Sequence, residues 1–544
     1  MKRFKINLEY MVDKVIYKTN VFETEHFNIN YTAKEDHIKL DIKATSPMEN
    51  VKFSMTVPYD FRSNDRIFLN GFQSWTECRE HFIDDEPIRL NLKQEAVRRI
   101  KPTSPYGDYN FVKYDHRKGC FHGFSYGYVR NGEDFNLFGS LSERFGYTII
   151  RANVPDNEII FERDLEGVTI DGEYTLLDVI HYIGNEKQVY DKYFETMNIP
   201  APRVGRTNGY TTWYNYYQNI TEDIVTTDLE SLSKVDSKID IFQIDDGYQT
   251  AVGDWLSIDG EKFPNGMKYI ADQIHEKGMK AGLWLAPLSC QVNSQVASEH
   301  PDWLIRDKFG KKLLCGINWG NFYGLDIEKE EVRDYIRNFF NVVLNEWGYD
   351  MVKLDFLYSA SVIPRNNKSR GQLMCEAMDF IRECVGDKLI LGCGVPLAAA
   401  FGKVDYCRIG ADIGLEWNRS KMILEDVCTK TTLWNSIFRR GLNGRAFVND
   451  PDVFLLRDNN MKMGFTQRKI SATVNHIFGS LLFTSDNVGD YNREKMDVLL
   501  SIFNNPQPKL VSAEFITKEL IEIKYIENGE EKRLCFDSNT GELM

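Results

Sequence analysis

Met351-Val352-Lys353-Leu354-Asp355-Phe356-Leu357-Tyr358 is the stretch that decides the fold and the centre of the predicted site. Because side chains alternate along a strand, Lys353 and Asp355 point to one face and the apolar residues between them to the other. Two charges on a buried face are costly unless the strand end opens into a polar pocket, as at the carboxyl end of a barrel strand. There, an Asp beside a Lys stays ionised and can act as a nucleophile. The alternative is a structural Lys–Asp pair at the end of an ordinary strand.

From Pro202 onward the chain alternates between short apolar runs and helical patterns. Eight runs have the length and composition of buried strands: 210–214, 239–245, 281–286, 351–356, 389–392, 406–409, 446–449 and 481–485. The clearest helix spans residues 331–347, where apolar residues fall on one face and Gly348 follows as a stop. Eight such units over residues 199–490 predict an α/β fold, a (β/α)8 TIM barrel, in preference to an open doubly wound sheet.

The regions on either side of the predicted barrel have a different pattern. Residues 1–198 contain short alternating runs, such as 38–42 and 158–162, separated by Asn, Asp, Gly and Pro turns, which predicts an N-terminal β-sandwich domain. A helical pattern over 178–197 would carry the chain out of that domain. From about Tyr491 alternating strands return, with a turn at Asn528-Gly529, so residues 491–544 are expected to form a small C-terminal antiparallel β-domain.

Composition narrows the class of partner. The chain has 544 residues, of which 42% are hydrophobic and 27% charged, as in a globular protein of several domains. A net charge of −14 and scattered basic residues argue against nucleic acid or an anionic membrane and favour a neutral small molecule. No signal peptide or membrane-spanning run is visible, so a cytoplasmic location is expected. Composition specifies no oligomeric state.

Cofactor motifs are absent from the sequence. Ten cysteines lie singly between Cys78 and Cys535 without a C-x-x-C pair, which predicts free thiols. There is no H-E-x-x-H motif, no His/Cys cluster and no phosphate-binding loop, and Gly392-Cys393-Gly394 lacks the rest of a dinucleotide fingerprint. We therefore predict neither a metal ion nor a cofactor.

Polar residues collect at the ends of the predicted strands, where barrel enzymes place their catalytic groups. They include Asp245, Asp246, Trp284, Lys353, Asp355, Cys393, Arg408, Asp412, Asn449, Asp450, Asp452, Ser485 and Asp486. An Asp pair can bind vicinal hydroxyls, a Trp can stack on a sugar ring, and two further carboxylates can serve a retaining glycosidase as nucleophile and general acid. The alternatives are helix capping for Asp245 and Asp246 and a surface salt bridge between Arg408 and Asp412.

Seven of these segments resemble, in order, the motifs of the α-galactosidases of glycoside hydrolase family 36, most closely its shorter-chain branch. They are Phe242-Gln243-Ile244-Asp245-Asp246-Gly247-Tyr248-Gln249, Gly253-Asp254-Trp255, Gly282-Leu283-Trp284, Val352-Lys353-Leu354-Asp355-Phe356, Leu391-Gly392-Cys393-Gly394-Val395-Pro396, Tyr406-Cys407-Arg408-Ile409-Gly410-Ala411-Asp412 and Asn449-Asp450-Pro451-Asp452. The resemblance covers the whole predicted barrel. It departs from the family at Ala286, where many members carry Glu, and after Cys393, where the glycine run of the longer enzymes is missing.

The resemblance implies a role for each matching residue. Asp355 would be the nucleophile and Asp412 the acid/base. The implied sugar ligands are Asp245, Asp246, Lys353 and Arg408 for hydroxyl groups, Cys393 near position 2, and Trp284, Trp75 and Trp255 as aromatic contacts. Trp75 lies in a loop of the N-terminal domain, and the alternative for it is an ordinary core position.

The function expected on this basis is that of a retaining exo-glycoside hydrolase. It would remove terminal α-linked galactose from melibiose- or raffinose-type oligosaccharides by double displacement. One alternative is an α-N-acetylgalactosaminidase of the same fold, which needs room beside position 2. Another is a non-catalytic sugar-binding barrel, which predicts loss of Asp355 or Asp412, although both are present. Transglycosylation in place of hydrolysis would depend on water exclusion and acceptor binding.

Overall fold

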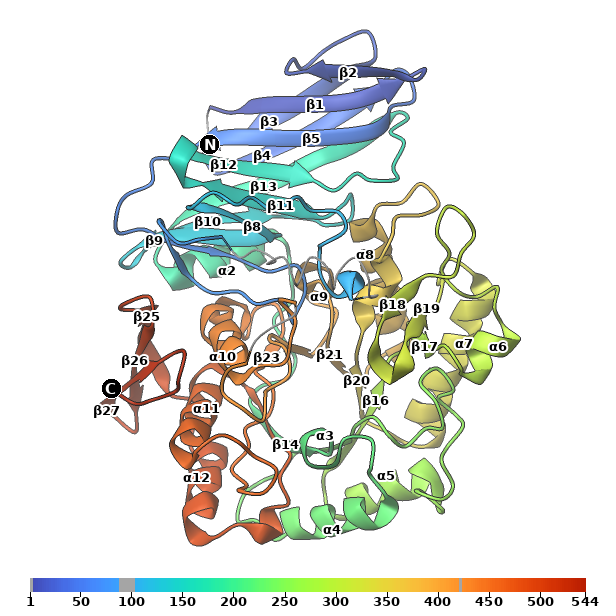
Figure 1. Ribbon diagram of the computed structural model, residues 1–544, viewed down its shortest axis with the longest axis vertical. Helices are drawn as coiled ribbons and strands as arrows, with labels where there is room; N and C mark the ends of the chain where they lie inside the picture. The colour runs from blue at the N-terminus through green and yellow to red at the C-terminus, as the bar shows by residue number, and fades with distance from the viewer. Residues whose placement is uncertain (1–2, 88–102, 420–422) are drawn as a thin grey trace.

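The protein consists of two N-terminal antiparallel sheets, a parallel barrel and a small C-terminal sheet (Figure 1). The computed structural model describes residues 3–87, 103–419 and 423–544. The sheets lie above the barrel in Figure 1, and the C-terminal sheet lies against its side. The predicted (β/α)8 barrel with β-rich flanking regions is therefore confirmed.

The N-terminal sheets contain thirteen strands among the described residues. One sheet has the order β2-β1-β5-β12-β11-β8, with bounds Val15–Thr19, Lys5–Val12, Glu49–Pro58, Glu158–Arg163, Thr148–Asn153 and Cys120–Phe124. The other has the order β3-β4-β13-β10-β9-β6-β7, with bounds Phe27–Ala33, His37–Ala44, Glu173–Gly184, Asp134–Ser140, Tyr126–Asn131, Arg66–Leu69 and His81–Phe82. Their apolar faces form a common core. In β4, for example, Ile38, Leu40 and Ile42 are buried while the residues between them are more exposed.

The predicted helix over 178–197 is wrong in its first half. Residues up to Gly184 belong to strand β13, which pairs with β4 on one side and β10 on the other. The run of Leu176, Leu177, Val179 and Ile180 is buried between these neighbours, so sheet pairing decides its conformation. Helix α2 begins only at Glu186, where the Asn185 side chain accepts a hydrogen bond from the Gln188 amide and caps the first turn.

The barrel sheet contains eight parallel strands in the order β23-β22-β21-β20-β16-β15-β14-β24. Their bounds are Val448–Asp450, Tyr406–Arg408, Leu389–Gly392, Met351–Leu354, Lys280–Leu285, Ile241–Ile244, Thr207–Thr211 and Leu481–Thr484. Each coincides with one of the eight predicted runs to within a few residues. The strands are buried on both faces by the enclosed core and the outer helices, which is why they read as continuous apolar runs.

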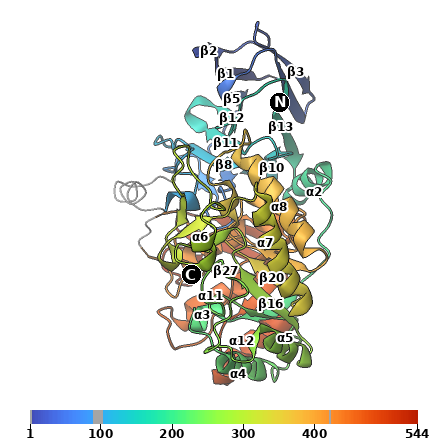
Figure 2. The same ribbon diagram turned by 90° about the vertical axis from the view of Figure 1, so that its right-hand side faces the viewer.

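Helices form the outer ring of the barrel (Figure 2). They are α4 Glu222–Leu232, α5 Gly266–Glu276, α7 Glu330–Asn341, α8 Arg370–Val385, α10 Thr429–Phe438, α11 Phe465–Phe478 and α12 Arg493–Asn504. Helix α7 continues through a π-helical turn at Val342–Glu346, so the helix predicted over 331–347 is confirmed in extent. Strands β23 and β24 form the two ends of the strand order, and the Ser480 amide donates to the Asn449 carbonyl across this seam at 3.0 Å.

A three-stranded sheet is inserted between β16 and α7. It contains β17 Ser289–Gln291, β19 Phe322–Gly324 and β18 Leu314–Gly316, in that order. Because the insertion leaves the carboxyl end of β16, it stands over the end of the barrel where polar residues were predicted to gather.

The C-terminal segment differs in part from the prediction. The sequence predicts strands from about Tyr491, whereas residues 493–504 form helix α12, capped by Asn492. Strands follow only at β25 Lys509–Phe515, β26 Leu520–Glu527 and β27 Glu530–Asp537. The predicted turn at Asn528-Gly529 is confirmed, and both residues have the positive φ values of a tight hairpin turn, 52° and 84°.

All ten cysteines lie among the described residues and are free thiols, as predicted. In the same part of the chain, no helix is long and apolar enough to cross a membrane.

Candidate active site

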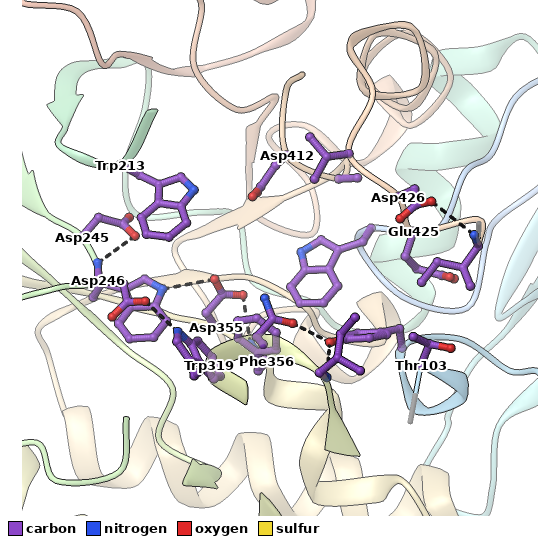
Figure 3. Close-up of a pocket in the computed structure, with 18 of the residues that line it drawn as sticks. Thr103, Trp213, Asp245, Asp246, Trp319, Asp355, Phe356, Asp412, Glu425 and Asp426 are labelled. Atoms are coloured by element: carbon purple, nitrogen blue, oxygen red, sulfur yellow. Dashed lines mark hydrogen bonds between the residues drawn. The ribbon is translucent and has the colours of Figure 1, made fainter. Parts of the chain in front are cut away.

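A pocket of about 230 Å³ opens at the carboxyl ends of the barrel strands (Figure 3). It is lined by Trp75, Thr103, Tyr106, Trp213, Asp245, Asp246, Trp284, Ile317, Asn318, Trp319, Lys353, Asp355, Phe356, Ala411, Asp412, Ile423, Glu425, Asp426 and Val427. The barrel strand ends, the inserted sheet and the N-terminal region all contribute to this wall. Seven of the ten predicted site residues lie in it, and the exceptions are Cys393, Arg408 and Trp255.

Asp355 is held firmly at the end of the central strand β20. Its backbone amide donates to the Leu285 carbonyl at 2.9 Å, which fixes it against the neighbouring strand β16. Its carboxylate accepts hydrogen bonds from Trp284 Nε1 at 3.1 Å and from the Phe356 amide at 2.9 Å. One oxygen is engaged by each donor, so the orientation of the carboxylate is set before any ligand enters.

Phe356 departs from the predicted alternation. The sequence pattern places it on the face opposite Asp355, but its ring lines the same pocket. Strand β20 ends at Leu354, and Phe356 adopts a left-handed conformation with φ 53° and ψ 32°. The alternation of side chains therefore ends before Phe356, and the predicted orientation of Phe356 is wrong. The ring packs at 4.8 Å from Trp319 and 5.0 Å from Trp75, measured between ring centroids.

Lys353 pairs with Asp245 and not directly with Asp355. Its Nζ lies 2.8 Å from Asp245 Oδ2, and both side chains are almost fully buried. Asp245 also accepts from Gln243 Nε2 at 2.7 Å and Thr211 Oγ1 at 3.3 Å. Burial works to lower the pKa of Lys353, but the negative charges of Asp245 and Asp355 together raise it, so the lysine is a permanent cation.

The ionisation of Asp355 differs from the sequence-based expectation. Burial raises the pKa of Asp355 above its ordinary range; the charge of Lys353 lowers it and that of Asp412 raises it, and the balance remains upward. The sequence predicts that the ammonium group dominates, whereas the desolvation of a carboxyl at the bottom of the pocket is the larger effect.

Asp246 is oriented by three side chains from three different loops. Its carboxylate accepts from Gln249 Nε2 at 2.6 Å, Trp319 Nε1 at 2.8 Å and Gln218 Nε2 at 2.9 Å. Burial raises the pKa of Asp246, and the hydrogen bonds from Gln249 and Trp319 oppose this. The predicted alternative of helix capping for the Asp pair finds no support, because both carboxylates face the pocket.

Asp412 lies across the pocket from Asp355 (Figure 3) and is tied to Arg408. Arg408 Nη1 donates to Asp412 Oδ1 at 2.8 Å, and the same guanidinium lies 3.2 Å from Asp450 Oδ2 and 2.8 Å from Asp452 Oδ1. Arg408 is 2% exposed, so this is not a surface salt bridge. Arg408 is not among the residues that line the pocket.

Asp452 carries the strongest constraint in this cluster. Its backbone has φ 75°, and its Oδ2 accepts from the Ile413 amide at 2.7 Å and from the Tyr214 hydroxyl. Burial raises the pKa of Asp452 to about 6; Arg408 lowers it, and the charges of Asp412 and Asp450 raise it. One guanidinium thus lies within ion-pair distance of three carboxylates.

Trp75 has features of both alternatives given for it, a core position and a position in the pocket wall. It is 9% exposed and packs against Phe356 and Tyr358, yet it also lines the pocket. Its Nε1 donates to Cys393 Sγ at 3.3 Å, and its ring closes over Gly394. Cys393 is therefore covered by Trp75. Trp255 is fully buried behind Trp284, with ring centroids 5.7 Å apart, so any effect of Trp255 on a ligand would be indirect.

The Melibiase family model matches residues 207–378, which span the barrel from β14 into α8. The chain is related to the α-galactosidases of glycoside hydrolase family 36. Alpha-galactosidase Mel36A of Lactobacillus acidophilus is 32% identical over 158 residues, which are 28% of this chain and 21% of that protein. The A type blood alpha-D-galactosamine galactosaminidase of Flavonifractor plautii is 32% identical over 26% of this chain and 14% of its own.

The similarity to solved structures extends beyond the melibiase region. TtGalA, an alpha-galactosidase from Thermus thermophilus in complex with stachyose, superposes with a TM-score of 0.70 at 25% identity, over 87% of this chain and 99% of that one. The matches to the two curated relatives named above span only about a fifth or less of their lengths. These comparisons confirm the resemblance to the α-galactosidase family that the sequence motifs indicate.

Several pocket residues of this melibiase relative were missed by the sequence reasoning. Trp213 lies two residues after the end of β14, so the rule that selected the other strand ends could have found it. Tyr106, Trp319 and Glu425 come from long loops or from the N-terminal region, and no local sequence signal marks them. No group of His, Cys, Asp and Glu in the described ranges has the arrangement of a metal site.

Proposed function

We propose that this chain hydrolyses terminal α-galactosides with retention of anomeric configuration. The observation that carries the proposal is that Asp355 and Asp412 line one pocket from opposite sides, beside the Asp245, Asp246 and Lys353 hydrogen-bonding groups. Trp213, Trp284 and Trp319 give this pocket aromatic surfaces of the kind that pack on the apolar face of a sugar. The stachyose held by the Thermus thermophilus structure supports an oligosaccharide as substrate.

In the first step, the Asp355 carboxylate would attack the anomeric carbon while Asp412 gives its proton to the glycosidic oxygen. The C–O bond to the leaving sugar breaks, and a covalent galactosyl ester of Asp355 forms. Arg408 holds Oδ1 of Asp412, so Oδ2 is the oxygen that would carry the proton. Trp284 and the Phe356 amide hold Asp355 in its attacking orientation.

In the second step, Asp412 would take a proton from water as the water attacks the anomeric carbon. The ester breaks, galactose leaves with its original configuration, and Asp355 is again a carboxylate. Lys353 and Asp245 remain paired throughout and would bind hydroxyl groups of the sugar.

The experiment is product analysis on p-nitrophenyl α-galactoside. Proton NMR during the first minutes should show the α-anomer of galactose before mutarotation. A 2-fluorogalactoside should label a peptide containing Asp355. First appearance of the β-anomer would exclude retention, and a label on another carboxylate would exclude Asp355 as nucleophile.

The alternative of an α-N-acetylgalactosaminidase is tested by the matching 2-acetamido glycoside. Trp75 and Gly394 pack closely beside Cys393, and an acetamido group there would need space that Trp75 fills. We therefore expect much slower turnover of that substrate. The non-catalytic alternative predicts binding of both glycosides without turnover of either.

A further inference from the structure

One end of the pocket carries a carboxylate that the mechanism does not use. In Figure 3, Trp213, Asp245 and Asp246 lie at one end, Glu425 and Thr103 at the other, with Asp355 between them. Glu425 belongs to the loop after β22, and the N-terminal region contributes the adjoining wall. If the Asp245 end holds the terminal galactose, the Glu425 end lies beyond the bond that is cleaved.

Glu425 is held in place by hydroxyl groups. Its Oε1 accepts from Thr76 Oγ1 at 3.0 Å, and its Oε2 accepts from the Tyr109 hydroxyl at 2.6 Å. The Tyr109 hydroxyl oxygen in turn accepts from the Leu424 amide at 2.8 Å, which fixes the loop as well as the side chain. Each carboxylate oxygen can accept a further hydrogen bond, because each has more than one lone pair.

This setting differs from that of a structural carboxylate. Glu425 is 8% exposed, yet among the residues that the structure describes no Lys or Arg forms an ion pair with it. Arg370 and Asp164, by contrast, form a buried ion pair at 3.1 Å, and neither residue lines the pocket. A buried carboxyl that faces a cavity and has no cationic partner among the described residues is placed to receive hydrogen bonds from a ligand.

We propose that Glu425 binds a hydroxyl group of the sugar unit that leaves, and thereby makes sugar leaving groups preferred over aryl ones. The inference rests on the proposed function, because it takes the Asp245 end as the galactose site. The expected substrate class is therefore an α-galactoside whose leaving group is a second sugar unit. It places Glu425 as a specificity-determining residue for the leaving group, with no part in bond cleavage.

The test compares melibiose with p-nitrophenyl α-galactoside in wild type and in Glu425→Gln. Loss of a hydrogen bond to a charged group corresponds to about a tenfold to hundredfold change. We expect kcat/KM for melibiose to fall by that factor, mainly through KM, and kcat/KM for the aryl galactoside to change by no more than about twofold. The matched control is Glu416→Gln, since Glu416 lies on the same loop but pairs with Lys462 outside the pocket lining. Both substrates should be unaffected in the control.

A second measurement varies the substrate. Melibiose analogues that each lack one hydroxyl of the glucose unit should include one that wild type cleaves about tenfold or more slowly than melibiose. In Glu425→Gln that same analogue should show no further loss, because the hydrogen bond is already absent.

The outcomes separate the two proposals. Equal losses for both substrates in Glu425→Gln, or no loss for either, would overturn the role of Glu425 while leaving galactoside hydrolysis intact. A loss confined to p-nitrophenyl α-galactosaminide would place Glu425 beside position 2 and would also overturn it. Absence of turnover of the aryl galactoside by wild type would remove the proposed function and this inference together.

Discussion

The buried ion pair between Lys353 and Asp245 allows a quantitative test. In Lys353→Met the side chain keeps much of its volume but loses its charge, and Asp245 is left in the core without its cation. The side chains are 5% and 3% exposed, and their charged atoms are 2.8 Å apart. Breaking such a pair from one side costs about 3–5 kcal/mol of unfolding free energy. Gln243 and Thr211 still donate to Asp245, which places the expected loss toward the lower end of that range.

The assay is urea unfolding at neutral pH, with thermal unfolding as a second measurement. A loss of about 3 kcal/mol corresponds to a fall in Tm of about 6–12 °C, taking about 2–4 °C per kcal/mol for a large domain. The double variant with Asp245→Asn should recover most of the lost stability, because it removes the unpaired charge. It should not recover activity, since both groups are proposed ligands of the sugar. The control is Lys238→Met, which breaks an exposed pair with Asp240 and should cost at most about 1 kcal/mol.

Two results would refute this reasoning. A Lys353→Met variant as stable as wild type would show that the pair contributes nothing to the fold. A double variant less stable than Lys353→Met alone would show that Asp245 stabilises the barrel through its other hydrogen bonds and not through the ion pair.

Three further predictions concern the site. In Trp284→Phe, Asp355 loses the hydrogen bond from Nε1, its pKa rises further, and the acid limb of kcat/KM should move to higher pH; an unmoved limb would show that this bond does not act on the nucleophile. Asp412→Ala should slow hydrolysis of melibiose far more than cleavage of an activated aryl galactoside, because only the poor leaving group needs a proton; equal losses would assign the proton to another group. Gly394→Ala should cost about 2–4 kcal/mol in urea unfolding, because φ is 58° and the new Cβ would lie 2.7 Å from the Trp75 ring, whereas Gly410→Ala has no contact closer than 3.4 Å and should be mild.

The barrel could be predicted because its strands are marked locally. Each is a short apolar run buried on both faces, and the stop signals between runs are clear. The predicted strand bounds are less accurate where pairing with a neighbouring strand decides them. Strand β14 begins at Thr207, three residues before the predicted start, because Thr207-Asn208-Gly209 pair with strand β24 far along the chain. The error over 178–184 has the same origin, since pairing on both sides of β13 overrides a helical pattern.

The site could be predicted as far as it is built from strand ends. Asp245 and Asp355 follow strands directly and Asp412 lies four residues after the end of β22, so the barrel geometry brings them together. Trp319 and Glu425 reach the same pocket from loops whose course depends on contacts with other regions. The residues around Trp319 and Glu425 do not indicate that these side chains reach the pocket. The pairing of Lys353 with Asp245 in place of Asp355 likewise depends on which strands are neighbours.

The seam between β23 and β24 has a consequence for how the molecule opens. Strand β20, which carries Asp355 at its end, is hydrogen-bonded on both sides, whereas β23 is an edge strand of three residues. Segments with fewer ladder partners open first in native-state hydrogen exchange. We therefore expect amides of β23 to exchange before those of β20. Asp450 ends β23 and helps to hold Arg408, so each such opening would release the anchor of Asp412 while Asp355 stays in place. In urea below the main unfolding transition, activity on melibiose should accordingly decline earlier than labelling of Asp355 by an activated fluoroglycoside, which needs no proton donor.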